Sequence, residues 1–137
     1  MHPKDADAVA RLCGELGYPT TVAELEPRLA RLLARDDVCL LVAESGGAVA
    51  GWIQVEQGLV LESEPWAEVG GLVVTEAMRG RGIGSALLSA GERWARERQM
   101  AVVRLRSNVV RSAAHDFYRK CGYEVFKTQL NFRKPLR

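Results

Sequence analysis

Three glycines at alternate positions, Gly80, Gly82 and Gly84, stand among arginines in the middle of the chain. Because glycine has no Cβ, the backbone N–H groups of such a loop can turn toward one bound anion. An apolar run ends shortly before the loop and a helical pattern begins within it. The positive end of a helix macrodipole would therefore face the same place. The pattern predicts a binding site for a phosphate or pyrophosphate.

Two common phosphate-binding loops do not fit these residues. The dinucleotide fingerprint needs another glycine at position 85, where this chain has Ser85. A nucleotide triphosphatase loop ends in Gly-Lys-Ser or Gly-Lys-Thr, and neither occurs in the sequence. The spacing alone leaves two interpretations open, an anion-binding loop and a plain turn between a strand and a helix.

The elements that would position the loop follow from hydrophobic periodicity. We expect helices over residues 5–16, 21–32, 84–98 and 111–121, and strands over residues 38–43, 48–55, 66–75, 102–106, 124–127 and 129–133. A strand, a long helix and another strand in succession predict a parallel crossover. Gly46 and Gly47 predict a tight antiparallel hairpin, and residues 57–65 read as a loop. Gly70 and Gly71 predict a bulge or a close backbone approach.

The composition predicts one domain over residues 1–137. The chain is 47% hydrophobic and 26% charged, and its net charge of +2 is too small for a nucleic-acid surface. The first residues lack the apolar core of a signal peptide, which predicts a cytoplasmic protein. Cys13, Cys39 and Cys121 are scattered and form no metal-binding spacing, so we expect buried thiols and no metal site.

The glycine loop also resembles a family signature. Arg79-Gly80-Arg81-Gly82-Ile83-Gly84 is similar to the Arg/Gln-x-x-Gly-x-Gly/Ala motif of the GCN5-related N-acetyltransferase (GNAT) family. Gly71-Leu72-Val73-Val74, Asn108 and Ala114-x-x-Phe117-Tyr118-x-x-x-Gly122-Tyr123 fall where that family places its other motifs. The resemblance covers roughly residues 38–133. It implies an α/β, single-domain layered fold, with a mixed, mostly antiparallel sheet, a central parallel pair and flanking helices.

The resemblance implies acetyl-coenzyme A (acetyl-CoA) as the donor and a primary amine, of a small molecule or a protein, as the acceptor. Transfer would be direct, with no metal. Backbone groups of Val73 and Val74 would meet the pantetheine arm, and a backbone N–H near one of them would polarise the thioester carbonyl. The glycine loop would cradle the pyrophosphate. The implied cofactor-binding residues are Leu72, Val73, Val74, Arg79, Gly80, Arg81, Gly82, Ile83, Gly84, Ser85, Asn108, Arg111 and Tyr118.

Two residues match positions of proton transfer in the family. Tyr118 would protonate the departing thiolate, since a phenol donates a hydrogen bond to developing negative charge. Glu68 lies on the strand where relatives often carry a general base, and His115 is a second candidate for that role. Each also has a structural interpretation: Tyr118 as a packed aromatic, Asn108 as a turn residue and Glu68 as a surface carboxylate.

Two other classes of function remain open from the sequence. A non-catalytic module that binds or senses acetyl-CoA would keep the glycine loop but show no turnover. A nucleic-acid binder would use the arginines of residues 93–111, but these lack aromatic interleaving and a known motif. The acidic stretch with Glu56, Glu62, Glu64 and Glu68 would attract a cationic amine, although such residues are most often solvated. Terminal strands near Phe132 could support a homodimer by edge pairing.

Overall fold

The computed structural model describes residues 1–137, which form two compact units, Met1–Arg106 and Ser107–Arg137. The first unit contains the whole sheet and three of the helices, and the second contains one helix and the C-terminal segment. No helix is both long and apolar enough to cross a membrane.

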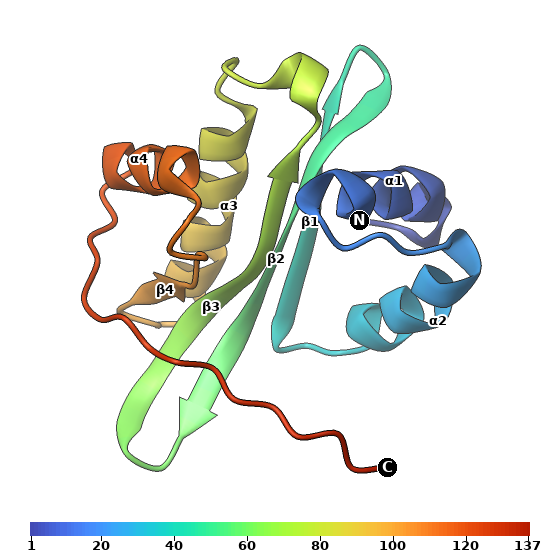
Figure 1. Cartoon of the computed structure of the whole chain (residues 1–137). Helices are drawn as coiled ribbons and strands as arrows, with labels where there is room; N and C mark the ends of the chain where they lie inside the picture. The colour runs from blue at the N-terminus through green and yellow to red at the C-terminus, as the bar shows by residue number, and fades with distance from the viewer. The chain divides into compact units, whose positions relative to one another are not determined.

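The sheet of the first unit has four strands in the order β1-β2-β3-β4 (Figure 1). Strands β1 (Val38–Ser45), β2 (Ala48–Val60) and β3 (Ser63–Val74) pair antiparallel, and β4 (Val103–Leu105) pairs parallel with β3. The expected mixed, mostly antiparallel sheet is confirmed. The parallel pair lies at the edge of the sheet instead of its centre, because no strand forms after β4.

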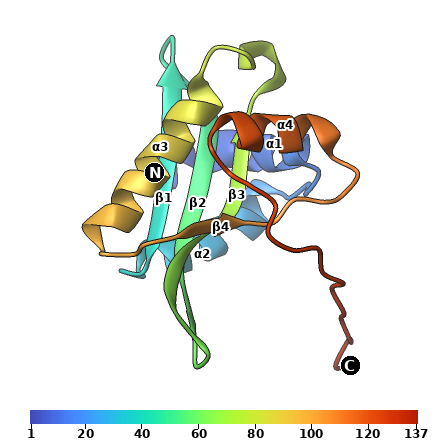
Figure 2. The same ribbon diagram turned by 90° about the vertical axis from the view of Figure 1, so that its left-hand side faces the viewer.

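Helices cover both faces of this sheet (Figures 1 and 2). Helices α1 (Ala6–Leu16) and α2 (Val22–Leu33) lie on one face, where Leu12 packs with Trp52 and Val73. Helix α3 (Ile83–Glu97) lies on the other face. There Gly91 approaches β2 so closely that a Cβ would lie 2.9 Å from Val55. Around Trp52 and Val55, the odd-numbered residues of β2 thus lie on the face that α3 covers, and the even-numbered residues lie on the face that α1 covers.

Local sequence signals explain where these elements begin and end. Gly46 and Gly47 join β1 to β2 with φ of 61° and 82°, the left-handed values that the hairpin turn requires. Thr21 caps α2 by accepting a hydrogen bond from the Glu24 N–H, and Glu24 returns one to the Thr21 N–H. Pro27 lies inside α2, which nevertheless runs to Leu33.

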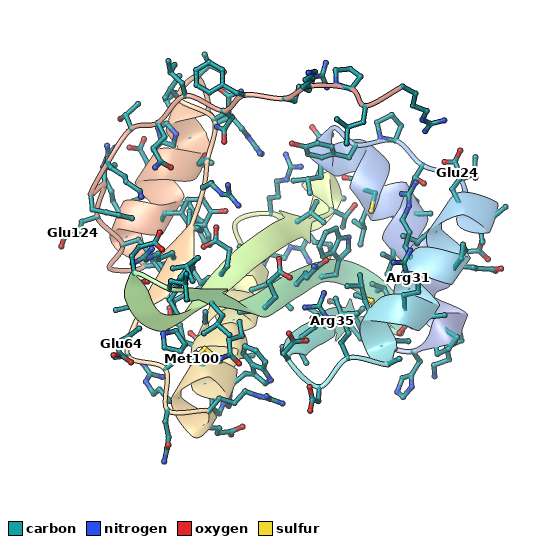
Figure 3. All side chains as sticks on the ribbon, turned by 90° about the horizontal axis from the view of Figure 1, so that it is seen from below. Glu24, Arg31, Arg35, Glu64, Met100 and Glu124 are labelled. Atoms are coloured by element: carbon teal, nitrogen blue, oxygen red, sulfur yellow. The ribbon has the colours of Figure 1, made fainter.

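The expectation of a loop over residues 57–65 is wrong. Strand β2 continues to Val60 and β3 begins at Ser63, so the two form one long hairpin. The register pairs Gly58 with Trp66, and a Cβ on Gly58 would collide with the indole ring. The missing side chain lets the ring lie over the neighbouring strand, which extends the ladder. Figure 3 shows the exposed Glu64 on the outer part of this hairpin.

The second unit contains helix α4 (Ser112–Lys120). Gly122 follows it with φ of 93°, the left-handed conformation expected after a helix end. The strands expected over residues 124–127 and 129–133 are wrong, since residues 123–137 contain neither helix nor strand. A strand is stable only when another strand pairs with it, and this unit supplies none.

Candidate active site

A bulge in β3 shapes the central part of the candidate site. The register pairs Gly71 with Gln54 and Val69 with Val55, so Gly70 is an extra residue without a partner on β2. Such a bulge bends the strand and increases its local twist. The break expected at the paired glycines is therefore present, and Gly70 is the residue that makes it.

The bulge coincides with the end of the parallel pairing. Strand β4 pairs with β3 only from Ala67 to Val69. From residue 70 to residue 74, β3 continues with β2 on one edge and no strand on the other. An open strand edge of this kind presents main-chain donors and acceptors to whatever lies beside it.

Strand alternation identifies the backbone groups on that edge. The Thr75 N–H donates to the Ala50 C=O at 2.7 Å, so residues of the same parity, including Val73, turn their N–H and C=O groups toward β2. The N–H and C=O groups of Leu72 and Val74 consequently point to the open edge. Of the two residues expected to meet the pantetheine arm, Val74 has its backbone groups at this edge, whereas those of Val73 bond within the sheet. Leu72, expected among the cofactor-binding residues, also has its backbone groups at the edge.

The glycine loop, residues 79–85, leads into α3. Gly80 and Gly82 have φ of 79° and 82°, which L side chains rarely adopt, and a Cβ on either would meet no atom within 4 Å. Gly82 is the N-cap of α3 and provides no side-chain cap. The first helical hydrogen bond runs from the Ala86 N–H to the Gly82 C=O, at 2.9 Å. The N–H groups of the first turn are therefore left for solvent or an anion.

The two arginines of the loop differ in their surroundings. The Nε of Arg79 donates to the Val74 C=O at 3.1 Å, which ties the loop back to the end of β3. Arg81 is exposed and forms no ion pair. Arg79 thus has a structural contact already, and Arg81 is the freer guanidinium for a phosphate.

Glu68 is held by two donors. Its Oε2 accepts from the Trp66 Nε1 at 2.9 Å, and its Oε1 accepts from the Arg106 Nε at 3.2 Å. The Glu68 side chain is only 15% exposed, whereas that of Arg106 is 75% exposed. Strand alternation puts Trp66 and Glu68 on the face opposite α3. Glu68 is therefore an oriented, ion-paired carboxylate, not a freely solvated one.

Arg104 adds a cation to the same cluster. It lies opposite Glu68 in the parallel register, and its guanidinium carbon sits 4.4 Å from the centre of the Trp66 ring. That contact fixes the ring whose N–H holds Glu68. The sequence pattern did not indicate Trp66, Arg104 or Arg106, because their contacts depend on how β3 and β4 pair.

Tyr118 belongs to the second unit, where it packs among aromatic rings. Its ring meets Phe117 edge to face at 5.2 Å between centroids and Tyr123 at 6.2 Å. Burial raises the pKa of Tyr118 above its ordinary value of 10.0, while Arg111 opposes that rise and Cys121 adds to it. The phenol stays protonated at neutral pH, as a proton donor must.

Asn108 and His115 bond to each other within the second unit. Asn108 Oδ1 accepts from the Val110 N–H at 3.2 Å, a turn closed by the side chain. A ring nitrogen of His115 lies 2.9 Å from the Asn108 C=O, and Asp116 pairs with Arg119 instead of its histidine neighbour. Asn108 therefore has the expected turn role, and His115 is held at the start of α4, where Arg111 is the N-cap.

Comparison with known proteins defines the class. The Acetyltransferase (GNAT) family model matches residues 9–123, most of the chain and parts of both units. The chain belongs to this family, as the glycine-loop resemblance implied. No group of three or more histidine, cysteine, aspartate or glutamate side chains is placed to hold a metal ion.

The relatives are N-acetyltransferases. An aminoalkylphosphonate N-acetyltransferase from Salmonella typhimurium is 32% identical over 135 residues, which cover 97% of this chain and 86% of that protein. A type 1 aminoglycoside N(6′)-acetyltransferase from Stenotrophomonas maltophilia is 30% identical, covering 98% and 90%. A solved aminoglycoside 6′-N-acetyltransferase from Acinetobacter haemolyticus shares the fold, with a TM-score of 0.86, 18% identity and coverage of 100% and 97%.

A further similar structure is an aminoglycoside N-acetyltransferase solved in complex with CoA. Its TM-score is 0.88 at 17% identity, covering 98% of this chain and 91% of that one. The family and these relatives establish the activity of the chain. It is an N-acetyltransferase that uses acetyl-CoA as donor and an amine as acceptor.

Proposed function

We propose that this enzyme acetylates a primary amine of a small molecule at the open edge of β3. One observation carries the proposal: within its 12 residues, β3 bears the held carboxylate Glu68, the Gly70 bulge and the free edge at Leu72 and Val74. The strand then runs into the glycine loop. A base, a thioester-binding edge and a phosphate loop thus follow one another along a single piece of chain.

The cofactor lies along this strand. The pantetheine arm pairs with the open-edge backbone groups of Leu72 and with the Val74 N–H, since the Val74 C=O already accepts from Arg79. Val73 packs beneath them. The pyrophosphate lies on the N–H groups of residues 82–85 at the start of α3, which carry partial positive charge. Arg81 neutralises phosphate charge, Arg79 shapes the loop, and Arg111 and Asn108 of the second unit complete the cofactor contacts.

The chemistry is a direct transfer. A neutral amine attacks the thioester carbonyl carbon, the new C–N bond forms, and the C–S bond breaks. Glu68 takes the proton from the amine, directly or through water, and the Tyr118 hydroxyl gives a proton to the departing thiolate. The Leu72 or Val74 N–H stabilises charge on the carbonyl oxygen. Holding both substrates together supplies much of the acceleration.

The relatives and the charge of the β2–β3 hairpin indicate the class of acceptor. The two relatives described above are named for aminoalkylphosphonates and for aminoglycosides, which are both small molecules that carry amines. The exposed Glu62 and Glu64 near the hairpin would favour a cationic amine. We therefore favour a small amine over a protein lysine, and an aminoglycoside-like cation over an anionic phosphonate.

The assembly is proposed on separate grounds. We place residues 1–137 in one catalytic domain, because the family match runs across both units. Leu130 and Phe132 of the C-terminal segment are 82% and 90% exposed. Covering such side chains is favourable, so we propose a homodimer in which this segment meets a second copy. We also propose a cytoplasmic location, because the three free thiols suit a reducing compartment.

Calorimetric titration of acetyl-CoA tests the cofactor site. The wild type should bind, and Gly82→Glu should not, because the new carboxylate would repel the pyrophosphate. Gly46→Glu is the matched control, since it imposes the same substitution on a glycine with positive φ in the β1–β2 turn, outside the glycine loop. Equal binding by all three proteins, or none by the folded wild type, would remove the glycine loop from the proposal.

A thiol-release assay then tests turnover with three classes of acceptor: aminoalkylphosphonates, aminoglycosides and a lysine-containing peptide. Turnover with a small amine, and none with the peptide, is the expected result. Binding of acetyl-CoA without turnover on any amine would favour the alternative function, a non-catalytic acetyl-CoA sensor.

A further inference from the structure

Glu15, near the end of α1, makes contacts that the catalytic scheme does not use. Its Oε1 accepts from the Glu76 N–H at 2.9 Å, and its Oε2 accepts from the Thr75 hydroxyl at 3.0 Å. These partners lie 60 and 61 residues away along the chain. Arg11, one helical turn earlier, completes the cluster at 3.5 Å from Oε2.

The bonded residues occupy a special place between β3 and α3. Strand β3 ends at Val74, and a short 3-10 helix, Glu76–Met78, follows it and leads directly into the glycine loop. Thr75 is the N-cap of that short helix, but its side chain makes no cap bond. The Glu76 N–H would lack a partner in such a helix, and Glu15 supplies one.

A second contact restrains the other end of the same segment. Arg79 bonds to the Val74 C=O. The pKa of Glu15 is lowered chiefly by the bond from the Glu76 N–H, and the charge of Arg79 adds a smaller effect. The segment from Thr75 to Arg79 is thus fixed at its first residues by Glu15 and at its last residue by its own strand. The direction in which the chain enters Gly80 depends on both contacts.

We propose that Glu15 is a positioning residue for acetyl-CoA, because it fixes the turn that aims the glycine loop at the pyrophosphate. The inference rests on the proposed role of that loop. Glu15 touches no cofactor atom in this scheme. Its carboxylate orders the path of the backbone before the N–H groups of residues 82–85 meet their anion.

This role separates two donors that share the acetylated pantetheine arm, of which only acetyl-CoA also carries the pyrophosphate and the adenosine nucleotide. Acetyl-CoA needs a correctly aimed loop, whereas S-acetylpantetheine has no pyrophosphate and needs only the edge of β3. In Glu15→Ala, the dissociation constant for acetyl-CoA should rise about tenfold, which corresponds to about 1.4 kcal/mol. The value of kcat/KM with S-acetylpantetheine should change less than about twofold, well below the tenfold effect expected with acetyl-CoA. Glu15→Gln, which keeps one acceptor oxygen for the Glu76 N–H, should fall between the wild type and the alanine variant.

Glu26→Ala is the matched control, since Glu26 is an exposed glutamate on α2 without these contacts. It should bind acetyl-CoA like the wild type. Amide hydrogen exchange gives a readout independent of activity: exchange at Glu76 should accelerate in ligand-free Glu15→Ala and stay unchanged in the control.

Three results would overturn the inference. One is an equal loss with both donors, which would mean general damage to the fold. Another is unchanged or tighter binding of acetyl-CoA in Glu15→Ala, since removal of a nearby negative charge alone would favour a phosphate ligand. If the folded wild type fails to bind acetyl-CoA, the loop role and this inference fail together. If Gly82→Glu abolishes binding while Glu15→Ala does not weaken it, only this inference fails.

Discussion

The carboxylate of Glu68 has its orientation set by neighbours on its own and the adjacent strand. If Glu68 is the base, Glu68→Gln should lower kcat about 100-fold or more and leave the KM for acetyl-CoA nearly unchanged. The amide keeps the shape of the side chain, and its one oxygen can still accept from either Trp66 or Arg106, so the fold should persist. Steady-state kinetics with the best amine, together with a thermal melt, would check this.

Trp66→Phe tests the orientation of that carboxylate without removing it. The ring remains over Gly58, but the Nε1 donor is lost, so Glu68 should become mobile. We expect kcat to fall about three- to tenfold, a loss no larger than the free energy of one hydrogen bond to a charged group. Trp94→Phe, on α3, makes the same chemical change away from Glu68 and should leave kcat unchanged. A fall in both variants would mean that indole loss acts through stability alone.

Tyr118 has a pH signature as well as a rate signature. Because burial raises its pKa above 10.0, the phenol carries its proton throughout the neutral range, and its ionisation should reduce kcat only above pH 10.0. The same shift means that the stability contributed by the neutral phenol is complete below pH 10.0 and is lost as pH rises through the folded pKa. Tyr118→Phe should lower kcat about 100-fold and remove this alkaline limb from the profile.

The sequence indicated these two residues because they fall at family motif positions. It did not indicate their partners. The Glu68–Arg106 contact joins residues 38 apart and the Glu15–Glu76 contact joins residues 61 apart. Such pairs arise only once strands and helices are docked, so local periodicity has no signal for them. For Val73, the register of β2 and β3 decides which backbone groups are free, and a single-residue sequence argument cannot give that register.

Gly70 and Gly71 are neighbours in the β3 bulge, but they differ in how much space a side chain would have. A Cβ on Gly71 would lie 2.6 Å from the ring of Trp52, whereas a Cβ on Gly70 would lie 3.6 Å from the flexible Gln54 side chain. Gly71→Ala should therefore lower the free energy of unfolding by about 1–3 kcal/mol, as overpacking usually does. Gly70→Ala should change it by less than about 1 kcal/mol, the size of a glycine-to-alanine propensity effect. Urea denaturation of both variants makes the comparison.

Element boundaries were predictable where a local signal fixes them. The capping box at Thr21, the Gly46-Gly47 turn and the glycine after α4 each act within a few residues, and each appears in the structure. The length of the β2–β3 hairpin was not predictable, because it depends on an indole of one strand lying over a glycine of the other. The prediction of two C-terminal strands failed because strand formation also depends on contacts between distant residues. A strand pattern in the sequence does not show whether another strand is there to pair with it.

For the whole molecule, the C-terminal segment carries the clearest expectation about assembly. If its exposed apolar side chains meet a second copy, the wild type should sediment as a dimer, and Leu130→Asp with Phe132→Asp should shift it toward monomer. Leu61→Asp, which places the same charge on the fully exposed tip of the β2–β3 hairpin, is the control. A monomeric wild type at micromolar concentration would contradict the dimer.

The Trp66 indole that bonds to Glu68 also gives the enzyme an intrinsic fluorescent probe beside the proposed base. Indole emission responds to nearby charge and to water. Of the other two indoles, that of Trp52 is buried in the core, and that of Trp94 lies on α3 against Arg98. An amine that displaces Arg106 from Glu68 would alter the surroundings of Trp66 before any thiol is released. Intrinsic fluorescence would then register the arrival of an acceptor that is never acetylated, and could separate recognition from turnover across a library of unlabelled compounds.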